Sequence, residues 1–364
     1  MRSSLMIRLS LPVLTALLAG CGSSAGPGVG TNLFFTAKTQ TTPFGGSNTI
    51  ALSGNYLFAG TDFGLRVFEF VRSNFASSPQ VPAVLNVVVP EFHTLVNPGN
   101  TSEPIVSLKV NGTVLYEIIG VDRKLLSVVD ISTPTDPKLL TQLKIDATGT
   151  AFRGIGDIAF SGDVAALALR TDGLGLYDVS NPSDLKLLHT EPIAGVDGAK
   201  QLVVVGKTAY VMGGGQLTIL DITTPTAVNT LGAFSGDIGI GSGGSAPPIA
   251  VDSRGYLYNA LGDYESVVDI RNPAAMKAVK VDFKTGTGWS QAIAMGLTGQ
   301  WLYVAQLDTL RGYDVSDPVH PVAQILIGPT ADLTLINDFV ATDDGYLFIS
   351  NEKGISLYGY PPKK

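Results

Sequence analysis

Cysteine and histidine are nearly absent from this sequence. Its 364 residues include one cysteine, Cys21, and three widely separated histidines, His93, His189 and His320. A single cysteine cannot form an intramolecular disulfide, and histidines this far apart do not have the spacing of zinc ligands. The sequence therefore excludes a disulfide-stapled fold and predicts no metal site made of these residues. Cys21 needs another explanation.

Charged side chains are also scarce, at 15% of the residues, and the basic ones form no cluster along the chain. The formal net charge is −7, and it becomes −9 without residues 1–20, which hold Arg2 and Arg8 and no acid. Because such a surface repels phosphate backbones, we expect no binding to nucleic acid. Long amphipathic helical patterns are missing after residue 20, whereas 42 glycines and 21 prolines are typical of short strands joined by tight turns.

The amino terminus explains the lone cysteine. Residues 1–20 combine a positive start, an apolar stretch over Leu9–Leu18 and small residues before Cys21, which are the three parts of an export signal. The apolar stretch is too short for a transmembrane helix. The segment Leu-Ala-Gly-Cys that ends at Cys21 resembles the bacterial lipobox, and this resemblance implies cleavage before Cys21 and its modification by acyl chains such as palmitate. An ordinary secretory signal that happens to contain a cysteine is the alternative.

A lipidated Cys21 would hold the protein to a membrane, since each buried methylene contributes about 0.8 kcal/mol. Residue 22 is Gly22 and not the Asp that resembles an inner-membrane retention signal, which favours the outer membrane of a Gram-negative bacterium, on either side. We expect residues 21–30 to be the lipidated cysteine with a flexible spacer, and residues 31–364 to be the exported domain.

A short phrase recurs through the rest of the chain. In order, the phrase has an apolar residue, any residue, an Asp, then Ile or Val, any two residues, and a Pro. The proline therefore follows the Asp by four positions. Five copies, spaced by 43 to 48 residues, begin at these aspartates: Asp130, Asp178, Asp221, Asp269 and Asp314. Degenerate copies with Glu69 and Gly359 in the Asp position flank them. Each period contains four short apolar stretches bounded by turn residues, which is typical of a propeller blade.

The count of these units predicts an all-β fold, a seven-bladed β-propeller with four-stranded antiparallel blades. The last unit is one strand short, and an orphan strand at Asn32–Lys38 precedes the first unit. Pairing the two closes the ring without leaving open strand edges. We therefore expect residues 31–364 to form one propeller that is monomeric.

The repeated phrase resembles the LVIVD repeat family of exported proteins, and the resemblance covers nearly all of the chain after residue 47. It implies a propeller and a surface location but no particular activity. The first unit departs from the pattern, because it lacks the phrase from Asp to Pro and carries an insertion over roughly Val71–Pro82.

The repeated aspartates have a structural interpretation and a functional one. An Asp that leaves a strand can accept hydrogen bonds from backbone amides just beyond it, and the proline fixes the following turn. Metal binding is the functional alternative. Because the Asp recurs in unit after unit, we favour the structural role.

The inner ends of the blades are the better candidate for a ligand site. Alignment of the units places one residue of each at the axial entrance: Thr49, Ser107, Asp157, Gln201, Pro248, Ala292 and Asp338. The turns between second and third strands bring further acids to the same face: Asp62, Asp122, Asp172, Asp263, Asp308 and Glu352. This acidic funnel would suit calcium, another divalent cation or a basic peptide, although turns favour Asp without any ligand. Three long connections on this face could carry specificity: Glu91–Pro104, Ile145–Gly156 and Phe234–Pro247.

Catalytic motifs are missing from the sequence. It contains no GxSxG elbow, P-loop, HExxH or sialidase-type box. We expect His189 and His320 on or beside outer strands, His93 in the first unit, and Trp289 and Trp301 in core packing. The leading hypothesis is a lipid-anchored binding or scaffold propeller for a protein or surface polymer, without catalysis and without a cofactor. The alternatives are a metal-dependent hydrolase or lactonase that uses the axial carboxylates, and an assembly factor of the outer membrane.

Overall fold

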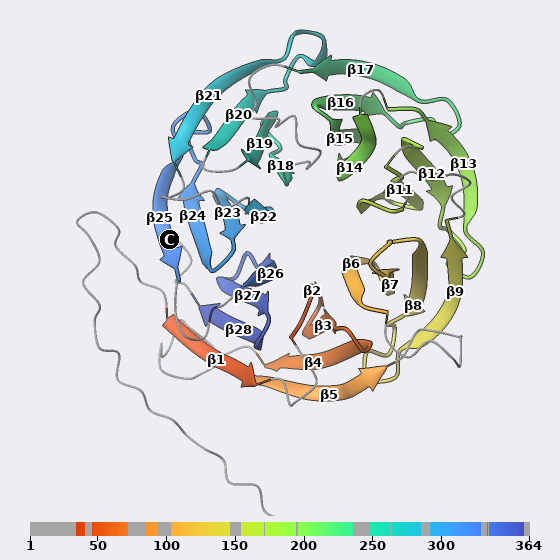
Figure 1. The fold of residues 1–364 in the computed structure, drawn as a ribbon, viewed down its shortest axis with the longest axis vertical. Coiled ribbons are helices and arrows are strands. Elements are labelled where there is room, and N and C mark those ends of the chain that lie inside the picture. The colour runs from red at the N-terminus through yellow and green to blue at the C-terminus, as the bar shows by residue number, and fades with distance from the viewer. Residues whose placement is uncertain are drawn as a thin grey trace, which may run out of the picture.

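The protein is a ring of seven antiparallel sheets with four strands each. Figure 1 shows the ring along its axis, with one strand of each sheet facing the central opening and another forming the rim. The computed structural model describes residues 34–40, 46–71, 84–92, 103–145, 154–170, 172–193, 196–235, 248–261, 264–284, 292–328, 333 and 335–359. The predicted fold, a seven-bladed all-β propeller, is confirmed.

Each blade runs from the axis outwards in chain order. The first three blades are β2 (Thr49–Ser53), β3 (Tyr56–Gly60), β4 (Leu65–Val71) and β5 (Val84–Phe92); β6 (Ile105–Asn111), β7 (Val114–Ile119), β8 (Leu125–Asp130) and β9 (Lys138–Lys144); β10 (Ile158–Ser161), β11 (Val164–Ala168), β12 (Leu174–Asp178) and β13 (Lys186–Glu191). The next three are β14 (Val196–Val205), β15 (Thr208–Gly214), β16 (Gln216–Asp221) and β17 (Asn229–Phe234); β18 (Ile249–Val251), β19 (Tyr256–Leu261), β20 (Tyr264–Asp269) and β21 (Lys277–Lys284); β22 (Ala292–Thr298), β23 (Trp301–Gln306), β24 (Thr309–Asp314) and β25 (Val322–Ile327). The fifth blade also holds a 3-10 helix, η1 (Pro273–Ala275).

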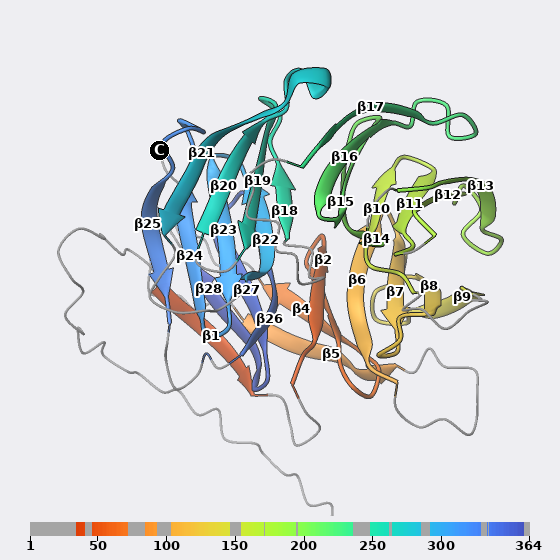
Figure 2. The same ribbon diagram turned by 45° about the horizontal axis from the view of Figure 1, so that its top comes forward.

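The seventh blade joins the two ends of the chain. It consists of β26 (Ile336–Ala341), β27 (Tyr346–Asn351), β28 (Gly354–Gly359) and, as its outer strand, β1 (Phe34–Gln40). The pairing of β1 with β28 is antiparallel and runs from Phe34 opposite Gly359 to Gln40 opposite Gly354. The predicted closing strand is therefore correct, and its described part lies slightly later in the chain than predicted. Figure 2 shows β1 along the outside of this blade.

The repeated phrase ends the third strand of five successive blades. In each, the Asp side chain accepts a hydrogen bond from the backbone N–H two residues later, at 2.8 Å for Asp130, 2.9 Å for Asp178, Asp221 and Asp314, and 3.1 Å for Asp269. The pKa of Asp178 and of Asp221 is lowered first by the hydroxyl of Ser180 or Thr223 and then by its backbone N–H. For Asp130 the backbone N–H of Ser132 lowers the pKa most, followed by its hydroxyl. The five aspartates thus make the backbone hydrogen bond that their structural interpretation predicts.

The proline of the phrase occupies the same place in five turns. A backbone hydrogen bond closes each turn between its first and fourth residues, at distances from 2.8 to 3.2 Å. The second residue of each turn is a proline of the phrase: Pro134, Pro182, Pro225, Pro273 and Pro318. Proline favours this position because its ring fixes φ near the value that the turn requires.

Apolar side chains pack between blades and not within one. The buried residues form seven clusters, and each cluster contains residues of two adjacent blades. Between the seventh and first blades, for example, Phe70 makes edge-to-face contacts with Tyr346 and Phe348, with ring centroids 4.7 and 4.9 Å apart. A single sheet exposes two apolar faces, and the ring lets each blade cover its neighbours.

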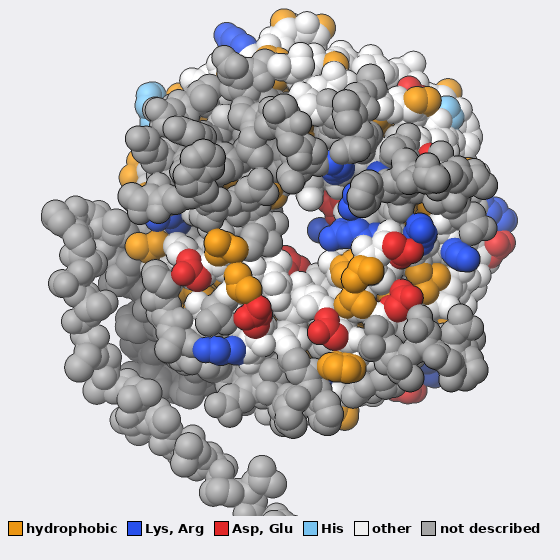
Figure 3. Space-filling view, viewed as in Figure 1, with side chains coloured by type: hydrophobic (Ala, Val, Ile, Leu, Met, Phe, Trp, Pro, Cys, Tyr) orange, Lys and Arg blue, Asp and Glu red, His pale blue; other side chains and the backbone are white. Residues whose placement is uncertain are grey.

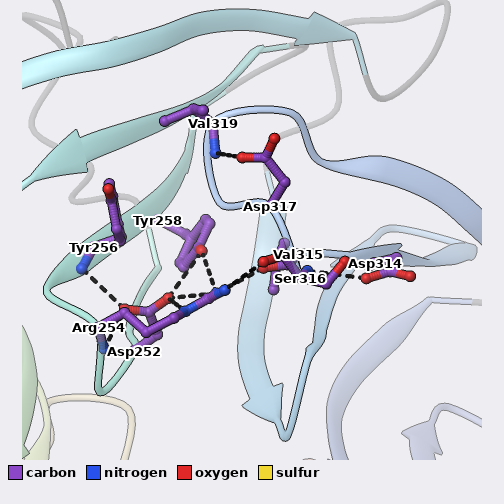
Figure 4. A network of polar contacts seen from close by, with 9 residues as sticks. All are labelled: Asp252, Arg254, Tyr256, Tyr258, Asp314, Val315, Ser316, Asp317 and Val319. Carbon is purple, nitrogen blue, oxygen red and sulfur yellow. Dashed lines mark hydrogen bonds and ion pairs between the residues drawn. The ribbon is translucent and has the colours of Figure 1, made fainter.

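One polar contact ties the fifth blade to the sixth (Figure 4). Arg254 donates to two backbone carbonyls of the sixth blade, those of Val315 at 2.6 Å and Ser316 at 2.8 Å. Its guanidinium also forms an ion pair with Asp252 at 2.7 Å, which orients it within its own blade. Tyr258 donates its hydroxyl to the same carboxylate at 3.1 Å. Arg254 is therefore held on one blade and bonded to the next.

Several predicted features lie outside the described residues. They include residues 1–20, Cys21, the spacer up to residue 30 and most of the insertion Val71–Pro82. The same applies to His93, Asp263 and Trp289. In the part of the chain that is described, no helix is long and apolar enough to span a membrane.

Candidate binding face at the channel mouth

Backbone hydrogen bonds connect neighbouring blades at one end of the channel, which we call the mouth. A carbonyl in the turn between the second and third strands of one blade accepts from an N–H just before or at the start of the next blade. Thr61 accepts from Ile105 at 3.1 Å, and Asn351 accepts from Ser47 at 3.1 Å. The remaining described pairs are Arg123 with Ile155, Arg170 with Ala199, and Leu307 with Ile336. These turns and the incoming segments therefore share one face, as predicted.

The five polar axial residues predicted from the alignment lie at equivalent places in this arrangement. Each lies two positions after the residue whose N–H donates to the preceding blade: Thr49, Ser107, Asp157, Gln201 and Asp338. Ser107 pairs with Ile118, and Gln201 pairs with Met212, each directly after a bulge in its strand. In the sixth blade the same register, directly after the bulge, belongs to Ala294 and not to Ala292. The structure thus brings the predicted residues together around the channel.

Three of these side chains, those of Asp338, Thr49 and Asp157, connect one blade to the next. Asp338 accepts from the hydroxyl of Thr49 at 2.8 Å and from the backbone N–H of Ile50 at 3.1 Å. The same hydroxyl of Thr49 accepts from the N–H of Leu108 at 3.2 Å. These contacts link the seventh blade to the first, and the first to the second.

Asp157 repeats the arrangement of Asp338 between the third and fourth blades. One of its oxygens accepts from the following N–H, that of Ile158, at 2.9 Å, and the other accepts from Leu202 at 3.3 Å. In Asp338 the corresponding following N–H is that of Phe339, at 2.8 Å. A carboxylate at this position therefore satisfies a backbone N–H of its own blade and one of the next blade, which is a structural use of the predicted ligand oxygens.

A lysine stands among the axial carboxylates. Lys109, on the first strand of the second blade, places its ammonium 3.9 Å from Asp157, although 48% of its side chain is exposed. Its pKa is raised, first by the charge of Asp157 and further by that of Asp338. Burial raises the pKa of Asp338 despite the hydrogen bonds that it accepts and the charge of Lys109. The mouth is therefore not the purely acidic funnel that the sequence suggests, because the charge of a lysine interacts with both axial acids.

Arginines form a second feature of the mouth that the sequence alignment missed. Arg123 and Arg170 occupy the turns between second and third strands in the second and third blades. The alignment compared only the aspartates of these turns, Asp122 and Asp172, and not the arginines beside them. In Figure 3, Lys and Arg side chains gather at the central opening on the side where Figure 1 places β6 and β14, and acidic side chains are spread around the face.

The other predicted acids lie in the turns between second and third strands, which surround the channel mouth. Asp62, Asp122, Asp308 and Glu352 are exposed, and Asp172 is half-buried. Asp122 forms an ion pair with Lys124 at 3.2 Å. These acids surround the opening in separate turns. Among the described residues, no group of three or more His, Cys, Asp or Glu side chains has the arrangement of a metal site.

The described histidines are peripheral, as predicted. His189 lies on the outer strand β13 and contacts Glu191 at 3.0 Å, and His320 contacts Asp317 at 2.8 Å in the turn before β25. Trp301, at the start of β23, packs against the core between the sixth and seventh blades. Most residues of the three long connections lie outside the described part of the chain. The described ends of these connections include Ile155 at the mouth and Phe234 at the end of β17.

Comparison with known families bears on the repeated phrase. The model of the LVIVD repeat matches four tandem segments, residues 106–144, 154–190, 198–235 and 243–281. This chain carries LVIVD repeats. The matched segments correspond to the second to fifth blades, so the repeat and the blade coincide. The sixth blade lies beyond them, yet Asp314 makes the same backbone hydrogen bond as the aspartates of the LVIVD blades.

Solved structures share the fold without close similarity in sequence. The WD40 β-propeller domain of Doa1 aligns with a TM-score of 0.63 at 11% identity, over 90% of this chain and 97% of that one. A chain of the Mitotic Checkpoint Complex gives 0.62 at 11% identity, over 95% and 100%. The computationally designed Ika8 protein gives 0.55 at 13% identity, over 87% and 97%. No curated protein sequence matches this chain.

Proposed function

We propose that this protein is an exported lipoprotein, held to the outer membrane by acyl chains on Cys21, whose propeller binds a protein or surface polymer without catalysing a reaction. The support for the anchor is the sequence around Cys21, together with the absence of a second cysteine. The support for binding is the geometry of the channel mouth.

The observation that carries the proposal is the use of the axial acids as links between blades. Both oxygens of Asp157 and of Asp338 accept backbone hydrogen bonds. A carboxylate used in this way is poorly placed to act as a metal ligand or as a nucleophile. It instead makes the ring rigid, and a rigid ring that presents variable turns on one face is suited to recognition.

Similar propellers support a role in assembly. One of the structurally similar chains was solved within the Mitotic Checkpoint Complex, so the fold takes part in a protein complex there. Four-stranded blades leave the turns of the mouth free to differ while the cores stay alike, which lets one fold serve many partners.

The anchor is tested by substituting Cys21→Ser and separating membranes from soluble fractions. We expect the variant to leave the membrane fraction as a soluble exported protein or an uncleaved precursor, because it lacks the thiol that receives the lipid. A variant that stays with the membrane as the original protein does would refute the anchor.

Binding is tested by photo-crosslinking in intact cells, with the crosslinker placed at exposed turn residues of the mouth, such as Asp62 and Glu352. The matched control places the crosslinker at Leu187, which is exposed on the rim strand β13. A partner captured from the mouth and not from β13 supports the proposal. Equal capture at both places would contradict it, and stoichiometric calcium, zinc or manganese in the native protein would favour a metal-dependent hydrolase instead.

A further inference from the structure

Two arginines at the mouth have an unusual backbone conformation. Among the described residues, those other than glycine with positive φ are Arg123, at 54°, and Arg170, at 45°. Side chains with a Cβ rarely adopt this left-handed region, because the Cβ approaches the following carbonyl oxygen. Such conformations persist where surrounding contacts enforce them, and they concentrate at functional sites.

The surrounding contacts hold both turns. The carbonyl of Arg123 accepts from Ile155 at 2.8 Å, and that of Arg170 accepts from Ala199 at 2.8 Å. Each turn is thus bonded to the segment that enters the next blade. Glycine would fit these backbone angles without strain, so the turn itself does not require an arginine at either position.

The guanidinium of Arg123 crosses from the second blade to the third. Its Nη1 donates to the carbonyl of Gly156 at 3.0 Å, and the N–H of Gly156 donates to Ala168 at 2.6 Å, two residues before Arg170. The two arginines therefore approach the same short stretch of the third blade. Burial lowers the pKa of Arg123, the positive charge of Arg170 lowers it further, and the negative charge of Asp157 raises it.

The acid next to this pair is already committed. Asp157 follows Gly156 directly, both of its oxygens accept backbone N–H groups, and Lys109 lies 3.9 Å from one of them. Its single negative charge acts on two cations, because Lys109 pairs with it and Arg123 also feels its charge. Figure 3 shows Lys and Arg side chains together at this side of the opening.

We propose that Arg123 and Arg170 form a binding site for one oxyanion group of a ligand, a carboxylate or a phosphate, at the mouth of the channel. A guanidinium presents paired N–H donors that match the two oxygens of such a group, and a bound anion relieves the repulsion between the cations. This inference rests on the proposed function and names the chemistry of the ligand at the same face.

The rim restricts the ligand further. Asp62, Asp122, Asp308 and Glu352 are exposed on the surrounding turns. A polyanion would pass close to these acids and be repelled, whereas an isolated anionic group can reach the arginines at the opening. The ligand is therefore a small free oxyanion or a single acidic group on a chain that is otherwise neutral or basic.

Protection from an arginine reagent tests the site on the full-length protein in detergent. Phenylglyoxal labels accessible guanidinium groups, and mass spectrometry of the peptides identifies them. We expect inorganic phosphate, at constant ionic strength, to slow the labelling of Arg123 and Arg170 at least threefold, and to leave unchanged the labelling of Arg271, which is 60% exposed. Equal slowing at all three arginines, or at none, would overturn the proposal.

A variant separates binding from folding. Arg170→Gly removes the cation and suits the observed φ, so we expect its melting temperature to be retained or raised while its affinity for phosphate, measured by calorimetry, falls at least tenfold. Arg271→Gln, in the turn that follows β20 of the fifth blade, is the matched control and should bind as the original protein does. Unchanged affinity in Arg170→Gly would refute the site.

Peptides identify the source of the oxyanion and separate this proposal from the proposed function. A neutral peptide with a free terminal carboxylate is compared with its amidated form. Selective binding of the free acid indicates a protein ligand, and binding of phosphate alone indicates a small anion. Loss of the cellular crosslinks with intact phosphate binding would count against the partner only, whereas crosslinks without any anion binding would count against the arginine site only.

Discussion

The link between the fifth and sixth blades offers a quantitative test of how the ring is held. Arg254→Ala removes the two hydrogen bonds to Val315 and Ser316 (Figure 4). It leaves Asp252 with partners, since this carboxylate still accepts from the N–H groups of Arg254 and Tyr256 and from the hydroxyl of Tyr258. The substitution therefore removes the contacts between blades together with the ion pair to Asp252, whose carboxylate keeps its other hydrogen-bond donors.

The magnitude follows from the number and exposure of the lost contacts. A hydrogen bond to a charged group contributes about 1.5 to 3 kcal/mol. The Arg254 side chain is 39% exposed, so water replaces part of each contact. For two contacts we expect a loss of about 2 to 3 kcal/mol, and in a domain of this size a fall in melting temperature of about 5 °C.

The assay is thermal unfolding followed by circular dichroism, together with urea unfolding at constant pH. Arg271→Ala is the matched control, because Arg271 is on the same blade and bonds Asp269, a residue of its own strand connection, at 2.6 Å. It forms no bond to another blade in the described contacts, and we expect a smaller effect. A fall for Arg254→Ala no larger than that for Arg271→Ala would refute the assignment of Arg254 as a link between blades.

Three further changes test the closure, the packing and the acid response of the ring. Deletion of β1 should lower the melting temperature far more than an equal-length deletion in the spacer, because it exposes the edge of β28; similar curves for both deletions would contradict closure by this strand. Gly232→Ala should cost about 2 to 3 kcal/mol in urea unfolding, since the new Cβ meets the carbonyl of Pro273 in the next blade, whereas Gly206→Ala, with open space around it, should cost about 1 kcal/mol for its positive φ. Arg271 holds the pKa of Asp269 at about 2, below its ordinary value of 3.8, so the pair stabilises the fold above pH 4 and this contribution disappears as the pH falls through 2. The difference in melting temperature between the original protein and Arg271→Ala should therefore shrink over that range, and a difference that is constant with pH would argue against the pair.

The sequence by itself determined the architecture. Five phrases from Asp to Pro, spaced by 43 to 48 residues, defined the blades, because the Asp hydrogen bond and the proline turn are local and depend on residues two to four positions apart. The missing strand of the last unit likewise predicted the closure by β1. Local interactions of this kind leave a pattern along the chain that can be counted.

The chemistry of the mouth was decided by the tertiary structure. The sequence places Asp157 and Asp338 at the axial entrance as candidate ligands. It does not reveal the N–H groups of Leu202 and Ile50 that bond to them, because these come from the next blade, 45 and 288 residues away. Lys109 is likewise remote from both acids in sequence. Arg123 and Arg170 are 47 residues apart, and the packing of the third blade against the second lets their charges interact. The interaction between charges depends on their distance in space, whereas the repeat fixes only their spacing along the chain. The sequence therefore predicts a ring with a polar mouth, and the fold decides which charges meet at its opening.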